Sequence, residues 1–293
     1  HYKDKMSSRK LCRLLEGKVR KPESEITQRH KDIAAALQLV YEEALFKILK
    51  HLYSITKCKN VVLGGGCALN SVANGKILNN TPFEGIWIQP NASDGGTSIG
   101  VASYIYHTLF GHKRNFELKD AYLGPGCSSE EIRYFLNRQG VKYSEFEDGR
   151  ELVAVAAKLI YENNIIGWFH GRMEWGPRAL GNRSILANPL NPNAKELLNA
   201  KVKHREIFRP FAPVVCEDDC LKYFDIGPLI PEPSDFMLMV YPVRNEWQDK
   251  IPSVTHVDGS ARIQTIKRQQ NTLYYDLIKE FGRISGIPIL INT

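Results

Sequence analysis

The chain has 293 residues, of which 43% are hydrophobic and 24% are charged, an ordinary composition for a globular protein of about two domains. No apolar run reaches the ~18 residues of a membrane span, and no apolar stretch follows the basic N-terminal residues as it would in a signal peptide. We therefore expect a soluble, cytoplasmic protein. Residues 1–21 hold eight Lys or Arg and two acids, so they carry +6 of the formal net charge of +7. The nearly neutral remainder argues against a nucleic-acid-binding surface.

The first 110 residues alternate between helix and strand patterns. Apolar residues recur with helical spacing over residues 30–56. Next, "NVVLGGGCALNSVANGKIL" predicts a strand, a glycine turn and a helix, "GIWIQP" a second strand, and "SDGGTSIGVASYIYHTLF" a turn that runs into another helix. This order is typical of an α/β layer.

A polar stretch near residue 115 predicts a boundary between a domain over 1–115 and an α+β domain over 116–293. Ser128 or Ser129 is the predicted N-cap of a helix that runs to Asn137. Further helices are predicted at "ELVAVAAKLIYEN" and "NTLYYDLIKEFGRI", and strands at "IIGWFHG", "FAPVVCE", "FMLMVYPV", "ARIQTI" and "GIPILINT". Because the chain opens without Met and stops within a buried-strand pattern, we expect a piece of a longer protein.

The six cysteines show no disulfide-framework spacing and predict free thiols in a reducing compartment. Cys216 and Cys220 stand one helical turn apart, but no second Cys/His pair accompanies them. A zinc site there is the weaker reading.

Two strand-to-helix turns are candidate ligand sites. Gly64, Gly65 and Gly66 follow a β-branched strand, and glycines let backbone N–H groups approach a phosphate at a helix N-terminus. Tight packing alone explains such a turn equally well, since it matches neither the P-loop nor GxGxxG. Asp94 in "SDGG" is a metal or ribose ligand or, on spacing alone, more readily a helix cap. Together the two turns are typical of the second lobe of an actin-like ATPase fold, and one lobe cannot close around ATP.

The stretch "GRMEWGPRALGNRS" places Arg172, Arg178 and Arg183 within twelve positions, beside Glu174. The planar, always-charged guanidinium suits phosphate or carboxylate. Three such charges repel one another unless an anion or a carboxylate lies between them, and Glu174 can neutralise one. Arg178, next to proline and apolar residues, least resembles a solvated surface residue.

A second basic segment, "KVKHREIFRPFAPVV", adds Lys203, Arg205 and Arg209 before an apolar strand. A solvated basic helix face remains the alternative for Lys201, Lys203 and Arg205, whereas Arg209 lies beside proline among apolar residues. Arg262 in "DGSARIQ" is a weaker candidate. The arginine-rich segments together predict a polyphosphate or adenylate pocket.

These motifs resemble, in chain order, the O-carbamoyltransferase family of nodulation and antibiotic-biosynthesis enzymes over nearly all of residues 25–293. The motifs that carry the resemblance are "VVLGGGCALNSVANGKI", "DGGTSIGVA", "YLGPGCSSEEI", "GRMEWGPRALGNRS", "KHREIFRPFAPVV" and "GIPILINT". Members join an actin-like domain, similar to the universal tRNA threonylcarbamoyl-transfer protein, to a domain that resembles threonylcarbamoyl-adenylate synthases. The resemblance implies that this chain is a fragment, with the second lobe of the first domain and nearly all of the second.

The resemblance also implies an ATP-dependent enzyme that works in two steps. Carbamoyl phosphate and ATP give carbamoyl-adenylate and pyrophosphate, and the carbamoyl group then passes to a hydroxyl of a sugar-like or secondary-metabolite acceptor. The implied cofactors are ATP and a divalent metal, Fe or Mg, in the actin-like domain. No membrane partner is implied, and a homodimer is possible in this family.

Site residues follow from the same resemblance, position by position. The implied catalytic residues are Arg178, Lys203, Arg209 and Arg262. The implied nucleotide-binding residues are Gly64, Gly65, Asn70, Arg172, Arg183 and Asn292, and the implied metal ligand is Asp94. This role for Asp94 reverses the preference for a helix cap.

Two departures from the family pattern limit what this chain can do alone. The family motif continues past "NT" into a serine, and the metal-binding histidines belong to an upstream lobe; His1, His30 and His51 do not stand in that motif. We therefore expect the chain alone to be inactive in complete carbamoyl transfer. The alternatives are a tRNA threonylcarbamoylation-type enzyme, a non-catalytic nucleotide-binding module, and an actin-like sugar kinase, which would leave the arginine-rich segments unexplained.

Overall fold

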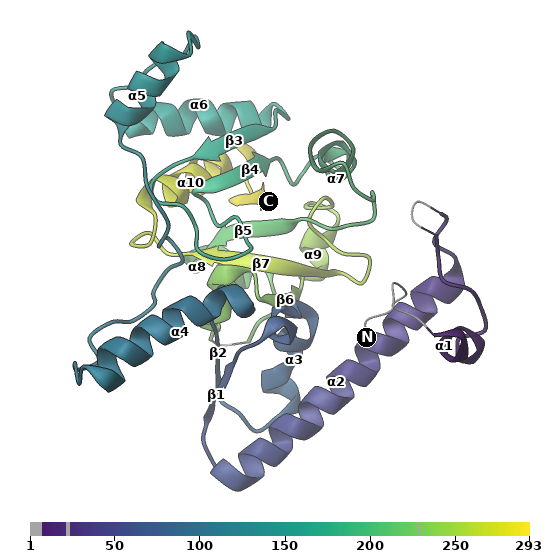
Figure 1. Cartoon of the computed structure of the whole chain (residues 1–293). Helices are drawn as coiled ribbons and strands as arrows, with labels where there is room; N and C mark the ends of the chain where they lie inside the picture. The colour runs from purple at the N-terminus through teal and green to yellow at the C-terminus, as the bar shows by residue number, and fades with distance from the viewer. Residues whose placement is uncertain (1–7, 22–23, 228) are drawn as a thin grey trace. The chain divides into compact units, whose positions relative to one another are not determined.

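The computed structural model describes residues 8–21, 24–227 and 229–293. By its internal contacts the chain divides into two units, one of residues 1–57 and 80–82 and one of residues 58–79 and 83–293, and Figure 1 traces the chain through both. The first seven residues of the basic segment 1–21 lie outside the described residues. The domain boundary predicted near residue 115 stays a prediction.

The first unit is built on one long helix, α2 (Gln28–Thr56), which follows the short helix α1 (Arg9–Leu14). α2 begins at a capping box in which the backbone N–H of Thr27 donates to Nδ1 of His30 at 3.1 Å. Such a box satisfies backbone donors that the first helical turn leaves open. The helix predicted over residues 30–56 is thus confirmed.

The second unit opens with the predicted alternation of strands, glycine turns and helices. β1 (Asn60–Leu63) and β2 (Gly85–Ile88) form a parallel pair, with Val61 opposite Ile86. The elements that follow these strands are η1 (Gly66–Leu69), α3 (Ser71–Asn80), η2 (Asp94–Gly96), α4 (Thr97–Ser103) and its π-helical continuation η3 (Tyr104–Leu109).

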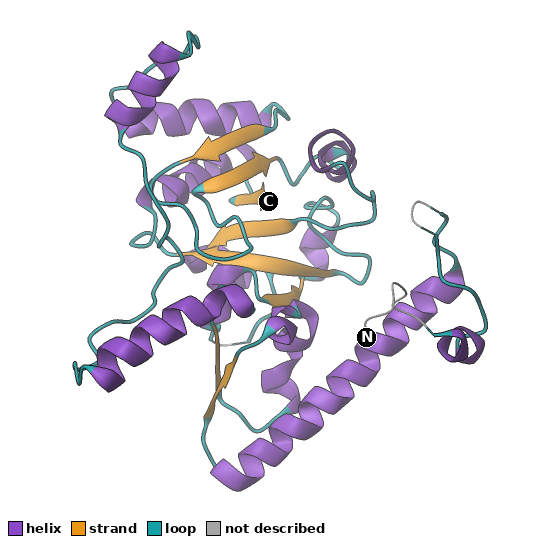
Figure 2. Cartoon of the chain, viewed as in Figure 1, coloured by secondary structure: helices purple, strands orange, loops and turns teal. Residues whose placement is uncertain are grey.

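A six-stranded mixed sheet forms the centre of the second unit (Figure 2). Its strand order is β3-β4-β8-β5-β7-β6, and only β5 and β7 pair in parallel. The strands are β3 (Ile166–Phe169), β4 (Arg183–Ala187), β5 (Ala212–Cys216), β6 (Met239–Pro242), β7 (Ser260–Ile266) and β8 (Ile289–Asn292). The expected α/β class with an α+β part is confirmed, while the likeness to particular lobes stays a prediction.

Two helices, α6 (Gly149–Tyr161) and α10 (Thr272–Ser285), pack together against this sheet. Their apolar faces bury Ile160, Leu277 and Phe281 completely, in one cluster with Leu186 and Leu290 of the strands. Each such side chain contributes roughly 1.5–3 kcal/mol when it leaves water. The burial explains why the helical patterns in these two segments were readable from the sequence.

The remaining helices are short and connect the strands. They are α5 (Ser129–Arg138), α7 (Ala194–Leu197), the π-helical η4 (Leu198–Lys203), α8 (Glu217–Tyr223), η5 (Glu232–Phe236) and α9 (Asn245–Gln248). α5 starts at Ser128, whose hydroxyl accepts the N–H of Glu131 at 3.2 Å, so the predicted N-cap is confirmed. Within the described part of the chain, no helix combines the length and apolarity needed to cross a membrane.

Strand β4 is the main element that the sequence did not predict. It begins at Arg183, inside the motif "GRMEWGPRALGNRS", and pairs with β3 and β8. A strand that opens with a charged residue and follows a glycine-rich turn has no clear alternation of its own. Its pairing on both sides is what makes it a strand.

Candidate functional site: a cationic cavity

The loop that links β3 to β4 is held from inside by Glu174. This side chain is only 9% exposed, and its Oε1 accepts the backbone N–H groups of Leu180 (2.8 Å), Asn182 (2.9 Å) and Arg183 (3.1 Å). Several N–H donors at one carboxylate oxygen both fix the loop and satisfy a buried charge. The expectation that Glu174 neutralises an arginine is wrong, since its recorded bonds go to the main chain.

Two of the three arginines in this motif fasten the backbone. Arg172 donates from Nε to the carbonyl of Gly124 at 2.9 Å and from Nη2 to that of Leu123 at 2.7 Å. Arg183 donates to the carbonyls of His170, Gly171 and Asn182 at 2.8–3.2 Å. Its guanidinium also lies 3.6 Å from the centroid of the Phe169 ring. Both arginines thereby hold the loop in shape.

Arg178 differs, because it lines a cavity of about 690 Å³ together with basic residues from distant segments. The other basic residues that line this cavity are Arg183, Lys203, Arg205 and Arg262. Lys203 ends η4, and Arg262 lies on β7. Asn292, at the end of β8, completes the polar lining. We call this site the cationic cavity.

No carboxylate side chain lines the cationic cavity. Burial, followed by the charges of Arg178 and Arg205, lowers the pKa of Arg262 to about 10. Burial and the charge of Arg205 lower the pKa of Lys203, and burial lowers that of Arg178. Facing cations without a counter-ion are costly, and an anion in the cavity would relieve that cost.

Orphaned polar atoms at the cavity wall support the same reading. Nε of Arg178, Nε1 of Trp168 and Oδ1 of Asn292 are buried without a hydrogen-bond partner in the described structure. Buried polar atoms are normally paired, so such exceptions call for a ligand or a water. Nδ2 of Asn292 donates to Oε1 of Gln264 at 2.6 Å and to the carbonyl of Ala179 at 3.1 Å, which fixes the orientation of its amide.

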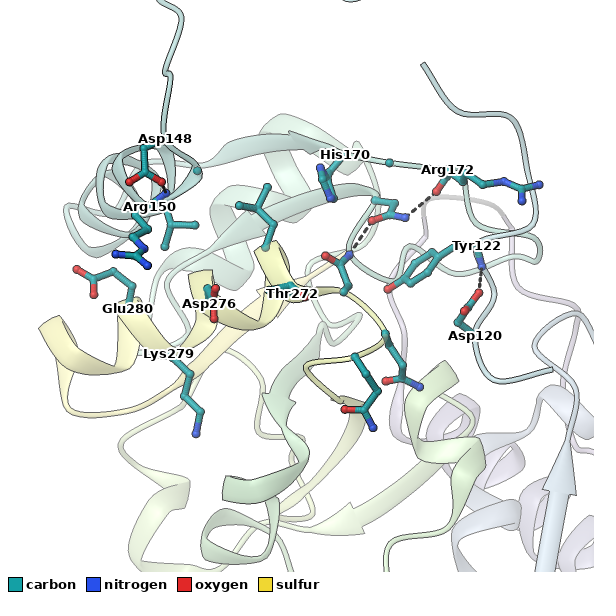
Figure 3. Close-up of a pocket in the computed structure, with 18 of the residues that line it drawn as sticks. Asp120, Tyr122, Asp148, Arg150, His170, Arg172, Thr272, Asp276, Lys279 and Glu280 are labelled. Atoms are coloured by element: carbon teal, nitrogen blue, oxygen red, sulfur yellow. Dashed lines mark hydrogen bonds between the residues drawn. The ribbon is translucent and has the colours of Figure 1, made fainter. Parts of the chain in front are cut away.

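A second and larger cavity, of about 1220 Å³, lies beside the N-terminal turns of α6 and α10 (Figure 3). Arg172 lines it and, through its carbonyl, accepts a hydrogen bond from Asn182 at 2.7 Å; Asn182 in turn accepts one from Asn271 at 2.8 Å. Its lining mixes acids with bases, and Lys279 and Arg283 are paired with Asp219 and Glu280. This balance of charge makes the cationic cavity the better candidate for an anion site.

Comparisons with known proteins agree with the sequence motifs. The family model described as carbamoyltransferase N-terminus matches residues 3–103, and the one described as carbamoyltransferase C-terminus matches residues 157–293. The chain belongs to the carbamoyltransferase family. The cationic cavity lies entirely within the part matched by the carbamoyltransferase C-terminus model.

Curated relatives support the same membership. The chain is 38% identical over 314 residues to an uncharacterized protein of Synechocystis sp. (98% of this chain, 50% of the relative). It is 40% identical over 276 residues to nodulation protein NolNO of Sinorhizobium fredii (94% and 40%) and 37% identical over 275 residues to nodulation protein NolO of Bradyrhizobium diazoefficiens (94% and 50%). The chain thus spans half or less of the length of these carbamoyltransferase-family relatives.

Among the implied catalytic residues of this carbamoyltransferase-family chain, the structure separates Arg209 from the others. Arg178, Lys203 and Arg262 line the cationic cavity, and Arg209 does not. Its side chain is 51% exposed, and its Nε donates to Oε2 of Glu206 at 2.8 Å. Its catalytic role therefore stays a prediction without geometric support.

The candidates in the carbamoyltransferase N-terminal part, Gly64, Gly65, Asn70 and Asp94, do not line the cationic cavity. Gly65 has φ +90 and donates its N–H to the carbonyl of Ala92 at 2.7 Å, a conformation that favours glycine. A Cβ at either glycine would meet nothing within 4 Å, so the turn is open to a ligand. Oδ1 of Asn70 accepts the N–H of Ala73 at 3.1 Å and so caps α3.

Asp94 is exposed, and its side chain makes no capping bond, because the N-cap of η2 is Ser93. Within the described residues, no group of three or more His, Cys, Asp or Glu could hold a metal ion. The residues present do not fit a metal by themselves, and no step of the chemistry below runs through one.

Sequence reasoning missed three residues of the cationic cavity and its wall: Arg205, Trp168 and Gln264. The one signal for Gln264 was its place two residues after Arg262 in a strand, which puts both side chains on one face of the sheet. Trp168 looks like an ordinary core residue in the sequence.

Proposed function

We propose that this chain belongs to an ATP-dependent O-carbamoyltransferase and that its cationic cavity is where carbamoyl-adenylate forms. The observation that carries the proposal is that Arg178, Lys203, Arg205 and Arg262 line one cavity with no carboxylate among them. A polyphosphate would supply the missing negative charge. Membership of the carbamoyltransferase family supplies the class of the transferred group.

The proposed chemistry begins with carbamoyl phosphate and ATP. Water cleaves carbamoyl phosphate into carbamate and phosphate. A carbamate oxygen then attacks the α-phosphorus of ATP, a new O–P bond forms, and the bond to pyrophosphate breaks. In the second step an acceptor hydroxyl attacks the carbamoyl carbon, its proton is lost, and AMP leaves.

The cavity residues act by position and charge. Negative charge builds on the phosphoryl oxygens as the O–P bond forms, and preorganised cations that face this charge lower the barrier. Arg178 is held by the loop that Glu174 clamps, and Arg262 by the ladder between β6 and β7. These rigid supports keep the cations in place without further reorganisation.

The acceptor and the second site belong to the same proposal. The turns at Gly64–Gly65 and Asp94 resemble those of an actin-like second lobe, where the adenylate would face a sugar-like or secondary-metabolite hydroxyl. The open Gly65 turn supports this assignment because its backbone can be approached closely. The likeness of the C-terminal part to threonylcarbamoyl-adenylate synthases is proposed on the motifs alone.

A titration calorimetry experiment tests the proposal. A polypeptide of residues 1–293 is titrated with a non-hydrolysable ATP analogue, alongside Arg178→Ala, Lys203→Ala and the control Lys201→Ala, whose side chain is exposed and does not line the cavity. We expect each cavity variant to weaken binding at least tenfold, since a charge-assisted hydrogen bond contributes about 1.5–3 kcal/mol. The control should bind as the wild type does.

Two outcomes would contradict the proposal. Binding that survives both cavity substitutions would move the nucleotide elsewhere, the Gly64 turn being the first place to look. Binding of ATP without carbamoyl-phosphate-dependent exchange of pyrophosphate into ATP, in the full-length protein, would favour a non-catalytic nucleotide-binding module.

A further inference from the structure

The segment between η4 and β5 contains two arginines that look alike in the sequence but differ in the fold. Arg209 points to solvent and pairs with Glu206 at 2.8 Å. Arg205 lines the cationic cavity with Lys203 and Arg262. Because both follow Lys203 closely and both are basic, only the path of the backbone decides which one enters the cavity.

That path turns at His204. This residue has φ 47, in the left-handed region that non-glycine residues seldom adopt. The turn ends the π-helical segment η4 and lets the N–H of Arg205 donate to the carbonyl of Asn199 at 3.1 Å. The chain thus folds back over η4, and the side chain that follows the turn is the one that reaches the cavity.

The side chain of Arg205 is also held before any ligand arrives. Its Nε donates to Oδ1 of Asn199 at 2.7 Å, and its guanidinium carbon lies 4.9 Å from the centroid of the Phe211 ring. Asn199 is itself fully buried and donates from Nδ2 to the carbonyls of Ile207 (3.1 Å) and Arg209 (2.9 Å). A guanidinium fixed in this way loses little side-chain entropy on binding.

Arg205 faces other cations without an acid of its own. The neighbouring carboxylate, Glu206, bonds to Arg209 instead. The charge of Arg205 contributes to the lowered pKa of both Lys203 and Arg262. Its Nη1 has no printed partner among the described residues, and its Nη2 makes one long contact, 3.4 Å to the carbonyl of Pro210.

We propose that Arg205 binds phosphate oxygens of the substrate in the cationic cavity, in the place that the sequence spacing assigns to Arg209. This inference rests on the proposed function of the cavity and adds to it a residue that the motif spacing does not mark. Asn199 and Phe211 hold Arg205 in the orientation that binding requires.

The test is a calorimetric titration of the 293-residue chain with ATP, in one buffer at one ionic strength. It compares the wild type with Arg205→Gln, Arg205→Lys, Arg209→Gln and the control Lys201→Gln. We expect Arg205→Gln to weaken the affinity about tenfold to a hundredfold, as the loss of a hydrogen bond to a charged group implies. Arg205→Lys should fall between, because it keeps the charge but loses the bond from Nε to Asn199.

The outcomes separate this inference from the proposed function. Affinity of Arg205→Gln equal to that of Lys201→Gln overturns the role of Arg205, while the proposed function stands if Arg178→Ala and Lys203→Ala still abolish binding. A larger loss for Arg209→Gln than for Arg205→Gln returns the role to Arg209. Absence of ATP binding in the wild type refutes both. A urea denaturation curve for each variant confirms that the variant is folded.

Discussion

The contact of Glu174 with three backbone amides yields a quantitative prediction. Glu174→Gln keeps an oxygen of nearly the same shape but removes the charge from the three hydrogen bonds to Leu180, Asn182 and Arg183. Bonds to a charged group contribute about 1.5–3 kcal/mol, and neutral ones about 0.5–1.5 kcal/mol. The loss is therefore roughly 1 kcal/mol per bond, or about 3 kcal/mol in all.

A loss of this size is a large part of the stability of an ordinary domain, which is about 5–15 kcal/mol. Urea denaturation of the wild type, Glu174→Gln and the control Glu151→Gln measures it, because Glu151 is exposed on α6. The free energy of unfolding should fall by about 3 kcal/mol in Glu174→Gln and by less than about 0.5 kcal/mol in the control. If the two variants unfold alike, the carboxylate does not hold the loop and the reasoning is refuted.

Two further predictions concern the core. Gly181→Ala should lower the melting temperature sharply, because Gly181 has φ +111 and a Cβ there would lie 2.3 Å from the buried ring of Tyr274, whereas Gly167→Ala, which meets nothing within 4 Å, should change it little; equal melting temperatures in a thermal scan would contradict this. Burial raises the pKa of the Cys216 and Cys220 thiols from 9.0 to about 12. The native state then holds protons that the unfolded state releases, so the free energy of unfolding should fall as pH rises from about 9 to 12, by up to ~1.4 kcal/mol per pH unit for each thiol, and a Cys216→Ala, Cys220→Ala variant should show a shallower fall in denaturation curves; an unchanged slope would refute it.

Elements with a strong local signal were predictable. The periodicity of α2, the serine cap of α5 and the apolar runs of β5 and β8 depend on neighbours in the chain, and the structure confirms all four. The six cysteines behave likewise: all are free thiols, as their spacing predicted. The sequence motifs also identified the family, because such combinations of glycine, arginine and proline recur only where a turn and its charges are kept together.

The sequence by itself determined that this chain is a mixed α/β protein of the carbamoyltransferase family with an excess of clustered arginines. Only the tertiary structure decided which of those arginines share a cavity. Arg172 and Arg183 became backbone fasteners, Arg209 went to solvent, and Arg205 took a place at the cavity wall. The physical reason is that a guanidinium bonds equally well to a carbonyl, a carboxylate or a phosphate, so its partner is set by the long-range pairing of strands and the turn at His204, which no local pattern reveals.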